Sequence, residues 1–192
     1  MKPRARFLTA LLCSTLALVA TSRTSLAEEA KDASYSQDEM FQKASDFFGG
    51  ASEGLAKAIA RVFEEQGRPN AFIAGEEISG AIGVGVRYGE GTLQQKTGAS
   101  RKVYWQGPSI GFDLGGDASK MFILIYHLPN EDALFQRFPA VDGSLYFVAG
   151  VGVNYQKSGD IVQAPIRSGV GLRAGINIGY MHYTREFSWV PI

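Results

Sequence analysis

Apolar and small residues alternate along most of the second half of this chain, and this period of two constrains the fold more than any other feature. The stretch SGVGLRAGINIGY, residues 168–180, has a glycine at nearly every second position. Successive side chains of a β-strand point to opposite faces, so one face of such a strand is almost bare. A phosphate-binding loop, a membrane barrel and a tightly closed soluble barrel could each use a strand of this kind.

The alternation begins at Glu76 and predicts a series of short strands separated by turn signals. The predicted strands are 76–88, 92–97, 101–106, 109–114, 120–128, 145–155, 161–167 and 170–180, with turns at 89–91 and 157–160. Residues 129–138 are expected to form a helical turn or two capped by Asn130, and Pro165 predicts an edge strand or a bulge. We therefore predict a mainly β fold, a small closed antiparallel β-barrel of about eight strands within residues 76–192.

An amphipathic helical segment is predicted over residues 36–67. Ser36 and Glu39 fit a capping box, and apolar residues recur at steps of three and four after them. Gly49–Gly50 is expected to kink or split the helix, and Gly67 to end it. Residues 121–126 are apolar on both faces of their strand, so we predict that the segment 37–66 covers the outer face of the barrel.

The first 27 residues have the pattern of a secretory signal peptide: a basic head, an apolar run and a small-x-small site. We predict cleavage after Ala27, with residues 28–35 as a linker. The apolar run of about 14 residues is short of the roughly 20 needed to span a bilayer, which disfavours a membrane anchor. A lipoprotein would need Cys13 as the lipidated residue, but Leu11 and Leu12 precede it where a small residue belongs.

Cleavage at this site changes the chemistry of the mature chain. It removes four basic residues and no acidic one, which leaves 15 basic against 19 acidic residues and a net charge of −4. A net negative charge does not favour binding to nucleic acid, and the chain has no polybasic stretch that would bind anionic lipid. Cys13 is also removed, so thiol catalysis and cysteine metal sites are excluded, and the mature chain is held by packing without disulfides.

Four short motifs imitate functional sites, and none has the expected surroundings. Residues 169–174 fit a dinucleotide loop without the helix that must follow it, and Ser109 in GPSIG fits a nucleophile elbow inside a strand pattern. His127 and His182 are isolated, which predicts no zinc site, and residues 113–117 indicate a glycine turn rather than a calcium loop. We therefore assign no catalytic, cofactor-binding or metal-binding residues, expect no cofactor, and leave the ligand-binding residues unknown.

Aromatic residues are numerous and allow three interpretations. They could fill the core and rim of the barrel, line an apolar pocket at its mouth for a lipid or glycan, or form the girdle of an outer-membrane barrel. Polar strands such as TLQQKT lack the lipid-facing band of about 10 residues per strand that a membrane barrel needs.

Several longer motifs resemble those of the envelope integrity protein A family of bacterial periplasmic proteins. They are RYGEG (87–91), WQGPSIGFDLGGD (105–117), LFQRF (134–138), VDGSLYF (141–147) and PIRSGVGLR (165–173). The resemblance extends over about residues 36–190. It implies a small soluble β-barrel in the Gram-negative periplasm, needed for a sound envelope and with no known catalysis. A distant similarity to SYLF-type lipid-binding domains, through the tryptophan-containing motif and the DGS segment, transfers no binding residue.

From these observations we expect a non-enzymatic periplasmic protein that supports cell-envelope integrity. Its partner would be an unidentified envelope component, a lipid, glycan or protein, with no nucleic acid and no transmembrane span in the mature chain. A lipid- or glycan-binding β-barrel module is the alternative. An unrecognised hydrolase and an outer-membrane barrel are less favoured.

Overall fold

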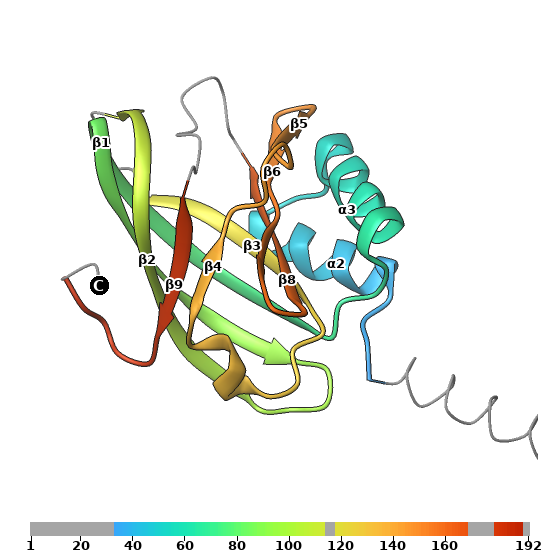
Figure 1. Ribbon diagram of the computed structural model, residues 1–192. Coiled ribbons are helices and arrows are strands. Elements are labelled where there is room, and N and C mark those ends of the chain that lie inside the picture. The colour runs from blue at the N-terminus through green and yellow to red at the C-terminus, as the bar shows by residue number, and fades with distance from the viewer. Residues whose placement is uncertain (1–32, 114–117, 169–178, 190–192) are drawn as a thin grey trace, which may run out of the picture.

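The computed structural model describes residues 33–113, 118–168 and 179–189 (Figure 1). Several of the predictions fall outside this part of the chain. They are the signal peptide with its cleavage site at Ala27, most of the linker, the glycine motif at 169–174 and most of the strand at 170–180.

The predicted helical segment is two helices, α2 (Gln37–Phe48) and α3 (Glu53–Gln66). The capping box at the start of α2 is confirmed: the Glu39 N–H donates to Ser36 Oγ at 3.2 Å, and the Glu39 carboxylate accepts from the Ser36 N–H at 2.7 Å. Gly49 ends α2 in the left-handed conformation (φ 88°), which glycine adopts without steric cost. Ser52 caps α3, and Gly67 follows its last turn.

Within the described ranges, nine strands form one antiparallel sheet in the order β4-β9-β2-β1-β3-β8-β6-β5, with β7 also paired to β8. The strands are β1 (Ala71–Gln95), β2 (Ser100–Asp113), β3 (Ala118–Tyr126), β4 (Arg137–Pro139), β5 (Tyr146–Val148), β6 (Val151–Val153), β7 (Gln156–Ser158), β8 (Ile161–Ser168) and β9 (Tyr180–Thr184). A 3-10 helix, η1 (Glu131–Leu134), follows β3, and the Asn130 side chain accepts from the Ala133 N–H at 3.0 Å, as the predicted cap.

The 25-residue strand β1 folds back on itself, and this corrects the prediction for residues 76–97. Its first half pairs with β3 and its second half with β2. The halves lie side by side: the Lys96 N–H donates to the Asn70 carbonyl at 3.0 Å, and a Cβ at Gly75 would lie 2.7 Å from the Gly91 Cα. The predicted turn at residues 89–91 is therefore wrong, because these residues pair along β2 and the chain reverses earlier, between the two paired halves.

The strand predicted at 161–167 is confirmed as β8, but the single strand at 145–155 and the edge position of Pro165 are wrong. Residues 145–155 form a hairpin, β5 and β6, because Ala149 and Gly150 take positive φ angles and turn the chain. Pro165 lies in β8, an internal strand paired with β3 on one side and with β6 and β7 on the other. Its position coincides with the gap between the β6 and β7 ladders, and such an interruption is where a sheet tolerates proline.

The sheet curls around an apolar interior, while α2 and α3 cover part of its outer face (Figure 1). Strand β3 contributes to both cores, with Phe122, Leu124 and Tyr126 under the helices and Met121, Ile123 and Ile125 inside. The prediction that the helical segment covers an outer face of the sheet is therefore confirmed. Gly54 at the start of α3 makes the approach possible, since a Cβ there would lie 2.4 Å from the Ala149 carbonyl oxygen.

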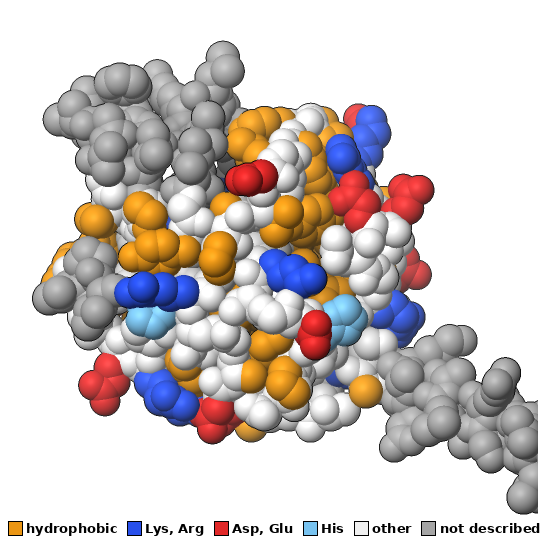
Figure 2. Space-filling view, in the orientation of Figure 1, with side chains coloured by type: hydrophobic (Ala, Val, Ile, Leu, Met, Phe, Trp, Pro, Cys, Tyr) orange, Lys and Arg blue, Asp and Glu red, His pale blue; other side chains and the backbone are white. Residues whose placement is uncertain are grey.

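The predicted closed barrel of eight strands is not confirmed, because the described sheet is a curled one with β4 and β5 at its ends. The β4 end approaches β7 through one isolated bridge, Ala140 with Gln156, and a 2.9 Å bond from the Val141 N–H to the Tyr155 carbonyl. On the face seen in Figure 2, hydrophobic side chains reach the surface over β5 and β6; Leu145 and Phe147 are exposed in this segment. No helix in the described part of the chain is long and apolar enough to cross a membrane.

Candidate functional site: a buried polar cluster inside the curled sheet

The pleat of the strands places charged side chains inside the curled sheet. Ala71, Ile73, Gly75 and Glu77 share one face of β1, and the first two belong to the inner core. Arg87 lies on the inner face of the second half of β1, two residues before Gly89, whose backbone is covered by the Trp105 ring. The inner face of β1 is thus apolar at Ala71 and Ile73 and charged at Glu77 and Arg87.

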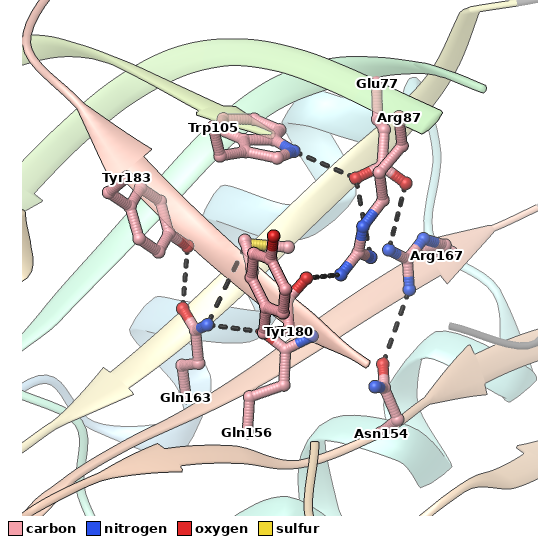
Figure 3. A network of polar contacts seen from close by, with 10 residues as sticks. Glu77, Arg87, Trp105, Asn154, Gln156, Gln163, Arg167, Tyr180 and Tyr183 are labelled. Carbon is pink, nitrogen blue, oxygen red and sulfur yellow. Dashed lines mark hydrogen bonds and ion pairs between the residues drawn. The ribbon is translucent and has the colours of Figure 1, made fainter. Parts of the chain in front are cut away.

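Glu77 is the centre of the polar cluster, and it is 5% exposed (Figure 3). Its Oε2 accepts a hydrogen bond from the Trp105 indole Nε1 at 2.9 Å. Its Oε1 accepts from Arg167 Nη2 at 3.1 Å, and Arg87 Nη1 lies 3.8 Å from Oε2. Three side chains from β1, β2 and β8 therefore converge on one carboxylate.

Arg87 is buried to 1% exposure and is only partly satisfied. Its Nη2 donates to the Tyr180 carbonyl at 2.9 Å. Its Nε and Nη1 have no hydrogen-bond partner among the described residues. Gly107 lies against this guanidinium, because a Cβ there would be 3.2 Å from Arg87 Nε and 2.2 Å from the Tyr180 carbonyl oxygen. Only glycine lets β2 and Tyr180 approach at this point.

Arg167 is the second cationic group of the cluster, and it is partly exposed to solvent. Its Nη1 donates to Asn154 Oδ1 at 3.4 Å, and its side chain is 13% exposed. With Arg87, it places two guanidinium groups against the single Glu77 carboxylate. The cluster carries a net charge of +1, counting only side chains that the structure describes.

The charges of the cluster shift the titration of its members. Burial raises the pKa of Glu77, but Arg167, Arg87 and the Trp105 hydrogen bond together outweigh burial, so its pKa lies below the ordinary value. Burial lowers the pKa of Arg87 below its ordinary value, in part against the attraction of Glu77. Glu77 is therefore an ionised acceptor at neutral pH, and a poor general acid.

A second set of polar contacts, between neutral groups, lies near this cluster in the interior (Figure 3). The Tyr183 hydroxyl donates to Gln163 Oε1 at 2.6 Å, and Gln163 Nε2 donates to Gln156 Oε1 at 2.5 Å. Burial raises the pKa of Tyr183 well above its ordinary value, so this phenol stays protonated as a donor. The buried Gln156 Nε2 has no hydrogen-bond partner in the described residues.

The described structure does not give Ser109 the backbone of a nucleophile elbow, and it places His127 and His182 on different elements. Ser109 pairs with Gly85 inside β2, which continues to Asp113 without a following helix, so the nucleophile-elbow geometry is missing there. His127 is exposed, with Nδ1 3.2 Å from the Asp160 carbonyl oxygen, and His182 lies in β9 opposite Gln106. No group of three metal-ligating side chains occurs in the described ranges.

The aromatic residues divide between the interior and one exposed cluster. Trp105 and Tyr183 pack in the inner core with ring centroids 6.1 Å apart. An exposed aromatic cluster lies outside β1 and β2, where the C-terminal segment returns over the sheet and the Tyr88 hydroxyl donates to the Trp189 carbonyl at 2.7 Å. Its members are Tyr88, Tyr104, Phe187 and Trp189. Trp189 is 73% exposed, which identifies this cluster as a possible contact surface.

Sequence reasoning missed Glu77, Arg87 and Arg167, although a signal was present. Each residue shares its strand face with glycines or inward apolar residues: Glu77 follows Gly75 by two, and Arg87 precedes Gly89 by two. The alternation did not decide which face points inward; Val86 is exposed, and the bare face with its isolated charges is the inner one.

Comparison with known proteins gives a family match and a structural match. Residues 33–192 match the model of a family described as envelope integrity protein A. The fold is similar to a crystal structure of a beta-barrel-like, uncharacterized protein from Brucella abortus, with a TM-score of 0.76 and 43% sequence identity. That match covers 83% of this chain and 99% of the other. No curated protein matches the chain.

Proposed function

Since this chain belongs to the envelope integrity protein A family, we propose that it is a non-enzymatic periplasmic protein that supports the cell envelope by binding one of its components. The observation that carries this proposal is the family match over residues 33–192, which includes both helices and the whole described sheet. The predicted signal peptide, cleaved after Ala27, would deliver the chain to the periplasm.

The geometry of the polar cluster supports binding rather than catalysis. Glu77 is held by one tryptophan and two arginines, so its carboxylate is neither a raised-pKa acid nor close to a nucleophile among the described side chains. His127 and His182 lie on separate elements, the first after β3 with its Nδ1 3.2 Å from the Asp160 carbonyl oxygen and the second in β9 opposite Gln106.

Deletion of the gene tests the envelope role. The deletion strain should become more sensitive to detergent and to outer-membrane stress, and the full chain should restore resistance. The triple variant Ser109→Ala, His127→Ala and His182→Ala should restore it equally when expressed at the same level. Loss of complementation by the folded triple variant would support an enzymatic function instead.

Export is tested separately on the same strains. The mature protein should begin at Glu28, be recovered from the periplasmic fraction without detergent, and have the mass of residues 28–192. A chain without residues 1–27 should stay in the cytoplasm and fail to complement. Recovery only in a detergent-requiring outer-membrane fraction would contradict the proposed location.

A lipid- or glycan-binding module is the second candidate, favoured by the exposed aromatic cluster. Partly exposed tyrosine and tryptophan side chains are typical of binding surfaces, because the ring packs on an apolar group while its polar atom stays hydrated. Lipid extraction and native mass spectrometry of protein purified from cells would reveal a stoichiometric ligand. Trp189→Ala should then lower ligand occupancy, whereas Phe147→Ala, an exposed residue on β5, should leave it unchanged.

A further inference from the structure

We infer that Arg87 and Arg167 form a binding site for an oxyanion group, a carboxylate, phosphate or sulfate, inside the curled sheet. This inference uses only the polar cluster and does not depend on the envelope role. The oxyanion could be a free ion or the charged end of a larger molecule.

The charge balance of the cluster is the first argument. Glu77 neutralises one guanidinium, and its Oε1 is bonded to Arg167 Nη2. Arg87 is farther from the carboxylate, with 3.8 Å between its Nη1 and Oε2, beyond hydrogen-bond distance, whereas the Trp105 indole N–H donates to the same oxygen at 2.9 Å. A buried charge without a full partner is costly, and a bound anion would supply the missing negative charge.

The free donors of Arg87 are the second argument. Nε and Nη1 lack partners in the described part of the chain, although the side chain is 1% exposed. The bond from Nη2 to the Tyr180 carbonyl holds the guanidinium in place, so its remaining N–H groups are fixed in direction. A guanidinium with free N–H donors can donate charge-assisted hydrogen bonds to the oxygens of carboxylate and phosphate groups.

Arg167 is the member of the cluster that reaches solvent, because 13% of its side chain is exposed whereas Arg87 is 1% exposed. Arg87 and Arg167 both lie against the Glu77 carboxylate. An anion that reaches Arg167 from solvent would therefore also lie close to the Arg87 guanidinium. We therefore expect both arginines to contribute to affinity.

Trp105 provides a direct reporter, because its indole bonds to Glu77. The chain has two tryptophans, so Trp189→Phe leaves Trp105 as the single fluorophore. This protein is titrated with sodium phosphate, sodium sulfate and sodium acetate against sodium chloride at constant ionic strength. We expect a saturable change in Trp105 fluorescence with at least one oxyanion, and a rise in Tm of about 5–10 °C at a hundredfold excess over Kd.

Variants identify the site within this experiment. Arg87→Met should weaken oxyanion binding about 10–100-fold, the usual effect of removing a charged hydrogen bond, and Arg167→Gln should weaken it in the same range. Lys102→Met removes an exposed cation on β2 and should leave Kd unchanged. Arg167→Gln keeps Glu77 and Arg87 balanced, so it remains informative if Arg87→Met fails to fold.

The source of the oxyanion is resolved by a further arm with a soluble short-chain phosphatidic acid. Tighter binding of this lipid than of inorganic phosphate, lost in Arg167→Gln, would identify a phospholipid headgroup, and equal binding would identify a free ion. The inference is overturned if no probe gives a saturable response, or if folded Arg167→Gln responds with the Kd of the parent protein.

Discussion

The two sides of the sheet are built differently, although they share the same strands. Under the helices, Phe122 stacks on Phe72 with centroids 5.0 Å apart, and the buried residues of this core carry no charge among those described. On the inner side, Ile123 and Met121 lead along the same strand toward Glu77 and two arginines. Hydrophobic burial stabilises a fold, whereas buried charges are costly unless each is paired.

The difference indicates where stability and binding reside. The outer core attaches α2 and α3 to β3, β6 and β8 by apolar packing without buried charges, although Ser45 Oγ and the Tyr126 and Tyr146 hydroxyls lack hydrogen-bond partners in the described residues. The inner side combines apolar packing with a charged cluster that retains free donors. We expect mutations on the outer side to change stability alone, and mutations in the polar cluster to change stability, pH dependence and anion binding together.

Removal of the helices should have the largest effect. A chain beginning at Pro69 would expose Phe72, Phe122, Leu124 and Tyr126, each worth roughly 1.5–3 kcal/mol when buried. We expect a fall in Tm of at least about 10 °C, or aggregation, by calorimetry and by light scattering. The matched control begins at Ala33 and keeps both helices. An unchanged Tm after the longer truncation would show that the sheet does not need its outer cover.

Replacement of Glu77 should have the next largest effect. Glu77→Gln keeps the size of the side chain but leaves two buried guanidinium groups without a carboxylate, which should cost about 3–5 kcal/mol in the free energy of unfolding. Chemical denaturation at neutral pH measures it. Glu76→Gln is the matched control, because Glu76 is the next residue along β1 and is exposed.

The pH dependence of the same variant gives an independent measurement. The folded-state pKa of Glu77 is lowered, so its contribution to stability is present above its ordinary pKa of 4.5 and is lost as pH falls below that value. The parent protein should lose stability steeply in this acid range, and Glu77→Gln should lose less. Parallel curves for the two proteins would mean that the carboxylate is not ion-paired in the folded state.

Local sequence signals predicted the local features of this fold. The capping box at Ser36, the break at Gly49 and the cap at Asn130 depend on neighbouring residues, and each is confirmed. The two apolar faces of residues 121–126 correctly predicted a covering helix, because a strand with no polar face must be buried on both sides.

Features that depend on long-range pairing could not be predicted in this way. The reversal within β1 has no strong turn signal, whereas the glycines at 89–91 imitate one while serving close packing inside the sheet. Whether the ends of the sheet join is decided by contacts such as Ala140 with Gln156, far from any local motif. The polar cluster was missed because the face of each strand that points inward follows from the curl of the whole sheet.

A methyl group on Gly89 should have an intermediate effect. An added Cβ would lie 2.1 Å from Trp105 Cε2, and the buried indole is held by Glu77 and cannot move freely. Gly89→Ala should destabilise by about 1–3 kcal/mol, as overpacking does, and should shift Trp105 fluorescence. Gly50→Ala is the control, because nothing lies within 4 Å of its added Cβ, and a comparable loss there would contradict the packing argument.

The smallest effect is expected where the helices meet the end of β1 at the surface. Glu39 pairs with Lys96, and this hydrogen bond, followed by that of the Ser36 N–H, lowers the pKa of Glu39 to about 2. Its contribution to stability is then present above the ordinary pKa of 4.5 and is lost as pH falls toward 2. Because the Glu39 side chain is 40% exposed, solvent screening limits this contribution to about 1 kcal/mol.

Glu39→Gln should therefore lower stability by about 1 kcal/mol at neutral pH and progressively less below pH 4.5. Asp38→Asn is the matched control, because it removes the same charge from the first turn of α2 without touching the pair with Lys96. If both variants lose the same stability, the helix dipole accounts for the effect, and the ion pair between α2 and β1 adds nothing. If Glu39→Gln loses more stability than Asp38→Asn, and 1 M salt reduces the difference, the difference comes from the Glu39–Lys96 ion pair. That pair would then help to attach the helices to the sheet.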